Sequence, residues 1–273
     1  MANDTATPTL AVRTTPLPLA GGRAWRLVER NIVVYRRIWV LIVSGFFEPL
    51  FYLLSLGVGI GALVGTVAGP DGRPIDYTAF VAPALLAASA MNGAVYDSTM
   101  NVFFKLKFAK TYDAMLATPL GPADIAVGEI TWAQLRGTLY SVAFLLVMAA
   151  LGLITSWWAV LALPATVLIG LAFAAIGMAC TSFMRSWQDF EYVQLAILPM
   201  FLFSTTFYPI TVYPRWLQVV VECLPLYHAV ELMRGLTTGV VDLSMLGHLG
   251  YFAVMIVVGV TLAARRLGAL LLS

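Results

Sequence analysis

The side chains that could do chemistry in this sequence are few, and they interrupt long apolar stretches. An ionisable or amide group in hydrocarbon is costly, so it usually faces protein or a water-filled cavity and marks a functional site. Nine such residues occur: Glu48, Asn92, Asp97, Gln134, Arg136, Gln188, Asp189, Glu191 and Gln194. We predict that a polar pathway passes Glu48, Asn92 and Asp97. The alternative for Asp97, which lies near the end of its apolar run, is contact with headgroup water.

Motifs of a membrane-embedded enzyme are missing from the sequence. No Gly-x-Ser-x-Gly, His-Glu-x-x-His or Cys-x-x-Cys occurs, and no carboxylate cluster separates the two histidines, His228 and His248. His228 beside Cys223 and Glu231 can be imagined as a nucleophile set, but an ion pair of Glu231 with Arg234 explains the same residues. No Gly-x-x-x-x-Gly-Lys-Ser/Thr occurs either, so the chain has no P-loop of its own for ATP.

The amino-acid composition indicates which class of protein, and so which kind of secondary structure, holds these residues. The 273 residues are 60% hydrophobic and 11% charged, and the mean hydropathy is +0.88. Soluble domains are about half apolar and a quarter charged, so a water-soluble fold is excluded. The net charge of +2, without a basic run that contains aromatic residues, gives no sign of a nucleic-acid partner. We therefore predict an all-α integral membrane protein.

Six apolar runs are long enough to cross the hydrocarbon core of roughly 30 Å. We predict transmembrane helices at residues 38–64, 78–101, 126–153, 158–183, 190–210 and 246–264. With the N-terminus in the cytosol, 13 of the 16 basic residues, Arg136 among them, fall on the cytosolic side. Only Arg73, Arg215 and Arg234 then lie outside. Both termini are therefore predicted to be cytosolic.

The N-terminal part is predicted to be a disordered tail over residues 1–20, followed by a transmembrane domain over residues 21–273. An amphipathic helix over residues 22–37 begins this domain, because apolar residues recur at spacings of three and four with arginines opposite. Its apolar stripe is Trp25, Val28, Ile32, Tyr35 and Trp39. Such a helix lies on the inner leaflet among anionic lipids, and the alternative is that it also contacts a cytosolic partner.

Glycines repeat every four residues in the outer half of the first run, at Gly57, Gly61 and Gly65. Small residues at this spacing let another helix approach closely. We predict helix packing here, either within the chain or against a second copy.

Two segments outside the apolar runs are amphipathic. The cytosolic loop, residues 103–122, places Phe104, Phe108, Tyr112 and Met115 on one helical face before a Pro/Gly turn. It could lie on the inner leaflet or contact a partner. Residues 211–240 contain two short segments that are predicted to form a re-entrant helix pair in the outer interface. His228, Glu231 and Arg234 share one face of the second segment and are predicted to shape an outer gate.

Two stretches resemble a known family. Residues 103–120, FFKLKFAKTYDAMLATPL, with residues 124–129, DIAVGE, are similar to the cytosolic loop of ABC-2 type exporter permeases. Residues 224–235, LPLYHAVELMRG, resemble the family's motif before its last span, although Leu224 stands where many relatives carry Asn. The nearest subgroup is the NodJ-like lipo-oligosaccharide permeases, and the daunorubicin-exporter permeases come next. The resemblance covers about residues 22–270 and the order of elements.

The resemblance implies a permease half of an exporter in a bacterial inner membrane, and not an enzyme. Its expected partners are membrane lipids, a second permease copy or paralogue, and two copies of a separate ATP-binding cassette ATPase that holds the ATP and Mg. It also implies that the cytosolic loop couples to this ATPase. The coupling residues are expected to be Lys110, Thr111, Tyr112, Asp113, Met115, Leu116, Thr118 and Pro119.

The cargo is not specified by these residues. The pathway is expected to have aromatic walls, formed by Phe201, Phe203 and Phe207, and such walls accept many amphiphiles. A glycolipid or lipo-oligosaccharide and a hydrophobic drug are both compatible. The alternatives to an exporter permease are a membrane-embedded enzyme of lipid or glycan metabolism and a membrane scaffold that transports nothing.

Overall fold

The structure is a computed structural model that describes residues 21–37, 47 and 49–271. The described chain is mostly helical, as predicted. Four of its helical stretches are long and apolar enough to cross a membrane: Tyr77–Phe108, Val127–Ala150, Trp157–Thr181 and Ser244–Ala263. They contain most or all of four helices: α4 (Tyr77–Tyr96), α6 (Pro122–Ala150), α7 (Ala162–Thr181) and α11 (Ser244–Leu271). These four coincide with the second, third, fourth and sixth predicted spans.

The first and fifth predicted spans correspond to shorter described helices. Most of the first half of the first span lies outside the described residues, and an apolar helix is described at Pro49–Val64. α8 (Phe190–Phe203) has 14 residues, fewer than the roughly 20 that cross a bilayer core. It ends there because Thr205 has a φ of 58°, in the left-handed region that an α-helix does not use. The six-span count therefore stays a prediction.

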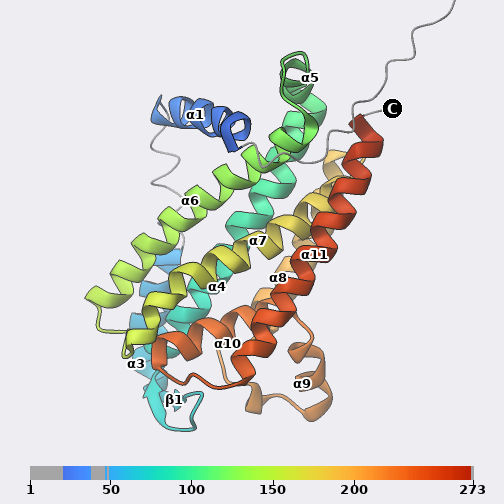
Figure 1. Ribbon diagram of the computed structural model, residues 1–273. Helices are drawn as coiled ribbons and strands as arrows, with labels where there is room; N and C mark the ends of the chain where they lie inside the picture. Colours follow the sequence, from blue (N-terminus) through green and yellow to red (C-terminus); the bar gives the residue numbers. More distant parts are fainter. Residues whose placement is uncertain (1–20, 38–46, 48, 272–273) are drawn as a thin grey trace, which may run out of the picture.

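The predicted cytosolic and outer segments gather at opposite ends of the bundle (Figure 1). α1 (Gly21–Arg37), α5 (Thr111–Leu116) and the C-terminal end of α11 lie at one end. The hairpin of residues 66–76 and α9 (Arg215–Glu222) lie at the other. The segments predicted to share a side of the membrane therefore share an end of the molecule.

A short β-hairpin is the exception to the all-α prediction. β1 (Thr66–Ala68) pairs antiparallel with β2 (Pro74–Asp76), with Val67 opposite Ile75. Gly72 has a φ of 77° in the turn, a conformation that glycine adopts without steric cost. Two extended segments of three residues each are enough to close the connection between the first helix and α4.

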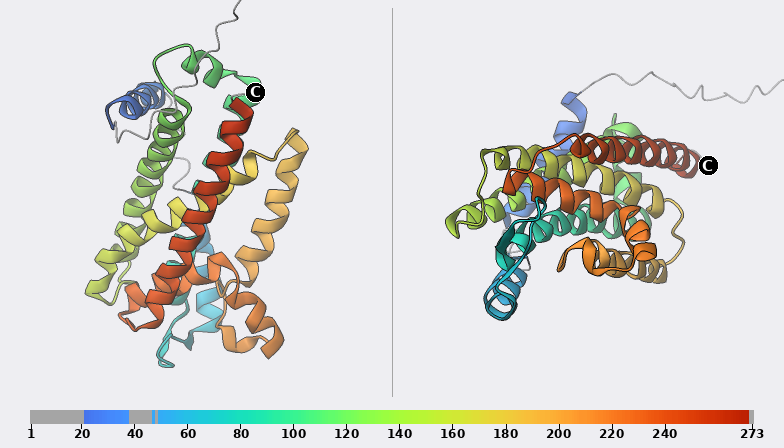
Figure 2. Two further views of the ribbon diagram at one scale, coloured as in Figure 1. Left: turned by 45° about the vertical axis from the view of Figure 1, so that its right-hand side comes forward. Right: turned by 90° about the horizontal axis from the view of Figure 1, so that it is seen from below.

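α4 forms the centre of the bundle. In its membrane-spanning stretch 72% of the most apolar window is buried, against 17% for α6 and 22% for α11. Its apolar residues show no helical period, because neighbouring helices cover most of its circumference. α7 and α10 (Pro225–Thr238) pack against it, and Figure 2 shows α6 and α11 at the rim. Three short 3-10 turns connect the helices: η4 (Trp157–Leu161), η5 (Trp187–Asp189) and η6 (Ile210–Val212).

α1 packs on α6 through part of its predicted apolar stripe. Val28 is buried and the Tyr35 ring lies 5.0 Å from the Trp132 ring, as that stripe would place them. Leu27 and Asn31 are buried as well, whereas Trp25 is half exposed. The buried face is thus rotated toward Leu27, because α1 lies against a protein helix. Trp39 lies outside the described residues.

The cytosolic loop is not the single helix expected from residue 103 onward. α4 continues through two π-helical stretches, η2 (Asp97–Asn101) and η3 (Phe104–Phe108). The helix then breaks, because Lys110 has a φ of 45°. α5 is therefore a separate short helix.

Candidate functional site

A cleft of about 690 Å³ lies between α4 and α8 and is bordered on a further side by Pro49 and Tyr52. Its aromatic lining includes Tyr52, Trp187, Phe190 and Phe201. Polar side chains project from α4, α6 and α8 into the same space: Ser89, Asn92, Tyr96, Thr99, Arg136, Tyr140, Glu191 and Gln194. Apolar walls with a few polar groups are typical of small-molecule sites. The cleft can hold a molecule with both an apolar and a polar part.

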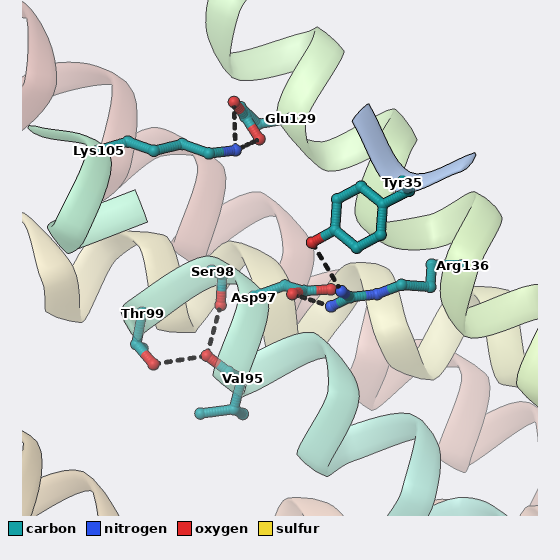
Figure 3. Close-up of polar contacts among 8 residues, drawn as sticks. All are labelled: Tyr35, Val95, Asp97, Ser98, Thr99, Lys105, Glu129 and Arg136. Carbon is teal, nitrogen blue, oxygen red and sulfur yellow. Dashed lines mark hydrogen bonds and ion pairs between the residues drawn. The ribbon is translucent and has the colours of Figure 1, made fainter. Parts of the chain in front are cut away.

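One wall of the cleft carries a buried ion pair. Asp97 of η2 is paired with Arg136 of α6, and Asp97 is only 6% exposed (Figure 3). Arg136 also donates a hydrogen bond of 3.2 Å to the Tyr35 hydroxyl of α1. Three elements therefore meet at one guanidinium. Removing one partner from such a pair leaves an uncompensated buried charge, so these elements are held in a fixed arrangement.

The backbone around Asp97 departs from α-helical geometry. The carbonyl of Val95, in the last turn of α4, accepts hydrogen bonds from the Ser98 and Thr99 hydroxyls of the π-helix η2, at 3.3 and 2.6 Å (Figure 3). Single π-helical turns are rare and are frequent at functional sites. The Ser98 and Thr99 hydroxyls thus supply additional donors to the Val95 carbonyl and stabilise the π-helical turn that carries Asp97.

A second ion pair, nearer to α5, also joins the continuation of α4 to α6. Lys105 of η3 contacts both carboxylate oxygens of Glu129 of α6, at 2.6 and 2.8 Å (Figure 3). Glu129 is buried, and Tyr112 lies in the same electrostatic environment. Burial, and then the Glu129 carboxylate, raises the pKa of Tyr112 above its usual range. The Tyr112 phenol is therefore neutral. The Lys105–Glu129 pair fixes η3 to α6, between α5 and the cleft.

The predicted pathway residues are only partly brought together. Asn92 and Phe201 line the cleft, and Asp97 reaches it through its partner Arg136. Phe203 and Phe207 do not line it, although the Phe207 ring lies 5.2 Å from that of Phe201. Glu48 lies outside the described residues.

Two interpretations of charged residues need correction. Asp97 does not sit in headgroup water, because it is buried against Arg136. Arg136 was counted among the cytosolic basic residues, but it lies at the midpoint of α6. Apolar residues flank both Asp97 and Arg136 along the chain, and the hydropathy of these stretches does not reveal that the two side chains form a neutral pair. Removing Arg136 from the count leaves the bias of basic residues toward one side intact.

The predicted outer gate residues Glu231 and Arg234 form a buried anchor. Arg234 is 2% exposed and pairs with Glu231 at 2.7 Å. Its guanidinium donates to the carbonyls of Thr205, at 2.7 Å, and Phe80, at 3.3 Å, and lies 3.8 Å from the centre of the Phe80 ring. The Thr205 hydroxyl donates to Glu231 at 3.1 Å. These contacts fix α10 to α4 and to the turn that ends α8.

His228 does not join Glu231 and Arg234, although the three share a helical stripe. Its Nδ1 atom lies 2.7 Å from Nδ1 of His248 in α11, and its ring stacks on Tyr251 at 4.0 Å. Burial, and then the neighbouring His248, lowers the pKa of His228. His228 therefore links α10 to α11 as a neutral ring, and His248 is a partner that the sequence did not indicate.

The predicted coupling residues occupy two different surfaces. Tyr112 and Met115 are buried in a cluster with Leu27 of α1 and Ile125 of α6. The chain itself covers the Met115 side chain, which therefore offers little surface to a partner. Among the predicted coupling residues Lys110, Thr118 and Pro119 are exposed, as are the neighbouring Ala114 and Ala117, whereas Thr111 is half-buried. The side chains of Asp113 and Leu116 lie outside what the structure describes.

The apolar face expected for the loop is also split. Phe104 and Phe108 are exposed on η3, away from the cluster that buries Tyr112 and Met115. The break at Lys110 separates the two pairs, so the periodicity that linked them does not extend across it.

The glycine repeat contains two kinds of position. A Cβ atom on Gly57 would lie 2.6 Å from Thr78 of α4, and one on Gly61 would lie 3.1 Å from it. The Thr78 hydroxyl also donates to the Gly57 carbonyl at 3.2 Å, so these glycines pack η1 (Ser55–Ile60) and α3 (Gly61–Val64) on α4 within the chain. Gly65 instead has a φ of 72° and ends α3.

A simple signal in the sequence could have identified the two ion pairs. α4 and α6 run antiparallel on either side of the cytosolic loop, so residues equally distant from its centre lie side by side. Lys105 and Glu129 are each 12 residues from Ala117, and Asp97 and Arg136 are 20 and 19 residues from it. Opposite charges at matched distances from a hairpin centre therefore predict interhelical pairs.

The described residues show no obvious centre for metal-dependent chemistry. Within residues 21–37, 47 and 49–271, no three His, Cys, Asp or Glu side chains gather closely enough to hold a metal ion. Cys180 and Cys223 are both free thiols on exposed residues. The arrangement offers binding groups and paired charges.

Comparisons with known proteins agree with this arrangement. The ABC-2 type transporter family profile matches residues 23–237. Nodulation protein J of Rhizobium leguminosarum bv. viciae is 35% identical over 266 residues, which cover 94% of this chain and 99% of that protein. Nodulation protein J of Rhizobium meliloti (strain 1021) is 33% identical, covering 85% and 86%. A probable doxorubicin resistance ABC transporter permease protein, DrrC of Mycobacterium tuberculosis, is 24% identical, covering 86% and 85%.

Proposed function

The chain belongs to the ABC-2 type transporter family, and from this premise we propose that it exports an amphipathic molecule, powered by a separate ATPase subunit. It is a multi-pass protein of a bacterial inner membrane. In the proposed complex, two permease chains, identical or paralogous, join two ATP-binding cassette subunits, which hold the ATP and Mg. The cargo is a glycolipid or lipo-oligosaccharide, or a hydrophobic drug.

The observation that carries the proposal is the cleft between α4 and α8. It combines aromatic walls with amide, carboxylate and guanidinium groups in helices that lie within the apolar part of the molecule. Such a lining suits a molecule whose apolar part stays near lipid while its polar part contacts Asn92, Gln194 or Arg136. The two ion pairs on α6 hold the wall of the cleft and connect it to η3, which leads to α5.

The proposed orientation places α1 and α5 in the cytosol and the β-hairpin outside, following the distribution of basic residues. In a variant with Cys180 and Cys223 replaced by serine, we expect an impermeant maleimide to label Asp71→Cys in intact cells. Lys107→Cys should be labelled only after the membrane is opened. Both positions are exposed, so access to the reagent differs only by side. Labelling of Lys107→Cys in intact cells would mean that the orientation is reversed.

The proposed export is tested by reconstitution. The chain is produced with its proposed ATP-binding cassette subunit, purified as a complex, and placed in liposomes with fluorescent lipid, glycolipid and anthracycline cargoes. We expect ATP-dependent movement of one of these classes to the side opposite the ATPase. An intact complex that hydrolyses ATP but moves none of them would contradict the proposal.

The exposed side of α5 and the turn after it are proposed to receive force from the ATPase. Because Met115 is buried, the informative changes are Ala114→Glu and Ala117→Glu, which add a charge to exposed positions of α5 and its end. Loss of a central docking contact typically costs 2 kcal/mol or more, so we expect ATPase binding to weaken by about thirtyfold. The measurement is binding of the purified ATPase to the chain in nanodiscs.

The matched control for these variants is Ala68→Glu, the same change at an exposed residue of the β-hairpin at the other end. It should bind the ATPase as the unmodified chain does. Equal binding by all three variants would mean that α5 does not contact the ATPase.

A further inference from the structure

Four aromatic rings form a closed cycle at the α5 end of the cleft. Phe103 lies 6.1 Å from Phe108 and 5.5 Å from Phe190, measured between ring centres. Trp187 lies 6.2 Å from Phe108 and 5.3 Å from Phe190. Ring pairs at these separations attract one another beyond simple burial. Each ring therefore contacts two others, and the four rings, the aromatic cycle, behave as one unit.

The aromatic cycle bridges two separate parts of the chain. Phe103 and Phe108 come from the continuation of α4, directly before the break at Lys110 and α5. Trp187 belongs to η5, and Phe190 begins α8. The cycle thus connects the segment proposed to receive force with the helix that forms the opposite wall of the cleft.

The cycle lies where the cleft meets the α5 end of the molecule. Trp187 and Phe190 line the cleft, whereas Phe103 is fully buried behind them. Phe108 is 60% exposed, so one member of the cycle is open to the surroundings at this end. The cycle therefore spans from the cleft wall to the molecular surface.

α8 is held weakly enough to move when these contacts change. None of its fourteen residues, all of them described, is buried. Its partly buried contacts with the central core come from Val193, Ile197, Met200 and Phe201, which all follow the first turn. Figure 2 shows α8 at the side of the bundle. The first turn of α8 thus depends on the aromatic cycle for its position.

We propose that Phe103, Phe108, Trp187 and Phe190 form an aromatic gate that closes the cleft at its α5 end. Displacement of α5 moves α6, on which it packs, together with η3, which Lys105 ties to α6, and so carries Phe108 away from Trp187; the first turn of α8 then swings outward. This opens the cleft for an amphiphile to enter from that side. The inference rests on the proposed export function, and it adds the element that couples motion of α5 to access.

Access to the cleft provides a test that does not require transport. The reporter is Ser89→Cys, a small change at a cleft-lining residue, in a chain with Cys180→Ser and Cys223→Ser. Inverted membrane vesicles expose the α5 end to an impermeant maleimide. Because a ring pair is worth about 0.5–1.5 kcal/mol, Phe108→Ala or Trp187→Ala should raise the labelling rate roughly 2- to 12-fold.

Two controls separate a gate from a simple anchor. Phe108→Tyr should label at the original rate, because it keeps the ring. Phe183→Ala removes an exposed ring at the same end whose contact is Arg266 and not the aromatic cycle, and it should also leave the rate unchanged. If Phe108→Ala and Trp187→Ala lower thermal stability without changing the labelling rate, the rings are only an anchor and the proposal is overturned.

A reversible bridge tests the role of opening in transport. In the same cysteine-free chain, Phe108→Cys and Trp187→Cys are joined by ethanediyl bis-methanethiosulfonate in the reconstituted complex. ATP-driven transport should fall about tenfold and recover with dithiothreitol, while each single variant is unaffected by the reagent. Full transport by the bridged complex would overturn the gate. If the unmodified complex moves no cargo, the export proposal fails, and the labelling experiment still decides whether the cycle controls access.

Discussion

Replacing Arg234 by alanine is expected to lower the free energy of unfolding by about 3–5 kcal/mol, or the apparent Tm by roughly 10 °C. The guanidinium is 2% exposed and satisfies Glu231 and two backbone carbonyls in three different elements. Alanine removes the donor of both carbonyls and leaves the Glu231 carboxylate with the Thr205 hydroxyl but without a cation, and it opens a cavity beside Phe80. Thermal unfolding of the purified chain in detergent measures the change.

Two further variants identify the cause of this effect. Arg234→Lys keeps the charge but cannot donate in three directions, so its stability should lie between those of the alanine variant and the unmodified chain. Arg215→Ala is the control, because Arg215 makes its hydrogen bond to Gln218 on the exposed helix α9. An Arg234→Ala chain as stable as the control would contradict the anchor. Such a chain would also restore the simpler view of Arg234 as a surface gate residue.

Replacing Arg136 by alanine is expected to have the second large effect, again about 3–5 kcal/mol, because Asp97 would remain buried as an unpaired carboxylate. The change also removes the donor to the Tyr35 hydroxyl, so α1 should lose its fixed position on α6. Hydrogen exchange of α1 should therefore increase together with the loss of stability. Both can be measured on the purified chain in nanodiscs.

The double variant Asp97→Asn with Arg136→Gln shows whether the unpaired charge is the cause. Two neutral amides can bond to each other, and replacing both partners of a buried pair often costs little. We expect this variant to recover most of the stability lost in Arg136→Ala. Lys107→Ala, a change of one exposed charge, should be neutral. If the double variant is as unstable as Arg136→Ala, the loss arises from packing and not from the charge of Asp97.

The ion pairs, the cleft and α5 are parts of one connected arrangement. Lys105 and Glu129 fix η3 to α6, while Asp97 and Arg136 fix η2 to the same helix closer to the cleft. A rigid hairpin of α4 and α6 can transmit a displacement without deforming. The break at Lys110 and the weakly buried α8 are the positions where movement is easiest. Between the exposed side of α5 and the cleft, the rigid α4–α6 hairpin therefore lies between two more flexible positions, the break at Lys110 and α8.

Much of the site could be predicted at the level of residue types. Asn92, Asp97 and Phe201 were chosen because polar or aromatic groups in an apolar run are unusual, and the structure brings all three to the cleft or its wall. Phe203 and Phe207 meet the same criterion but do not line the cleft: Phe203 lies two residues after Phe201, on nearly the opposite face of α8, and Phe207 lies beyond the end of that helix. A helical spacing in the sequence places residues on one face only as far as the backbone stays helical. In α8 the helix stops before Thr205, which has a left-handed φ.

The sequence by itself determined the membrane location, four long apolar helices, the family and the two short helices α9 and α10. Each of these follows from properties that add up along the chain, such as hydropathy, proline positions and local motifs. The charged partners and the buried face of α5 were decided only by the tertiary structure. An apolar helix such as α4 has no polar face that fixes its rotation, so packing sets it. That rotation brings Asp97 to Arg136, and the fold likewise buries Met115 and pairs His228 with His248.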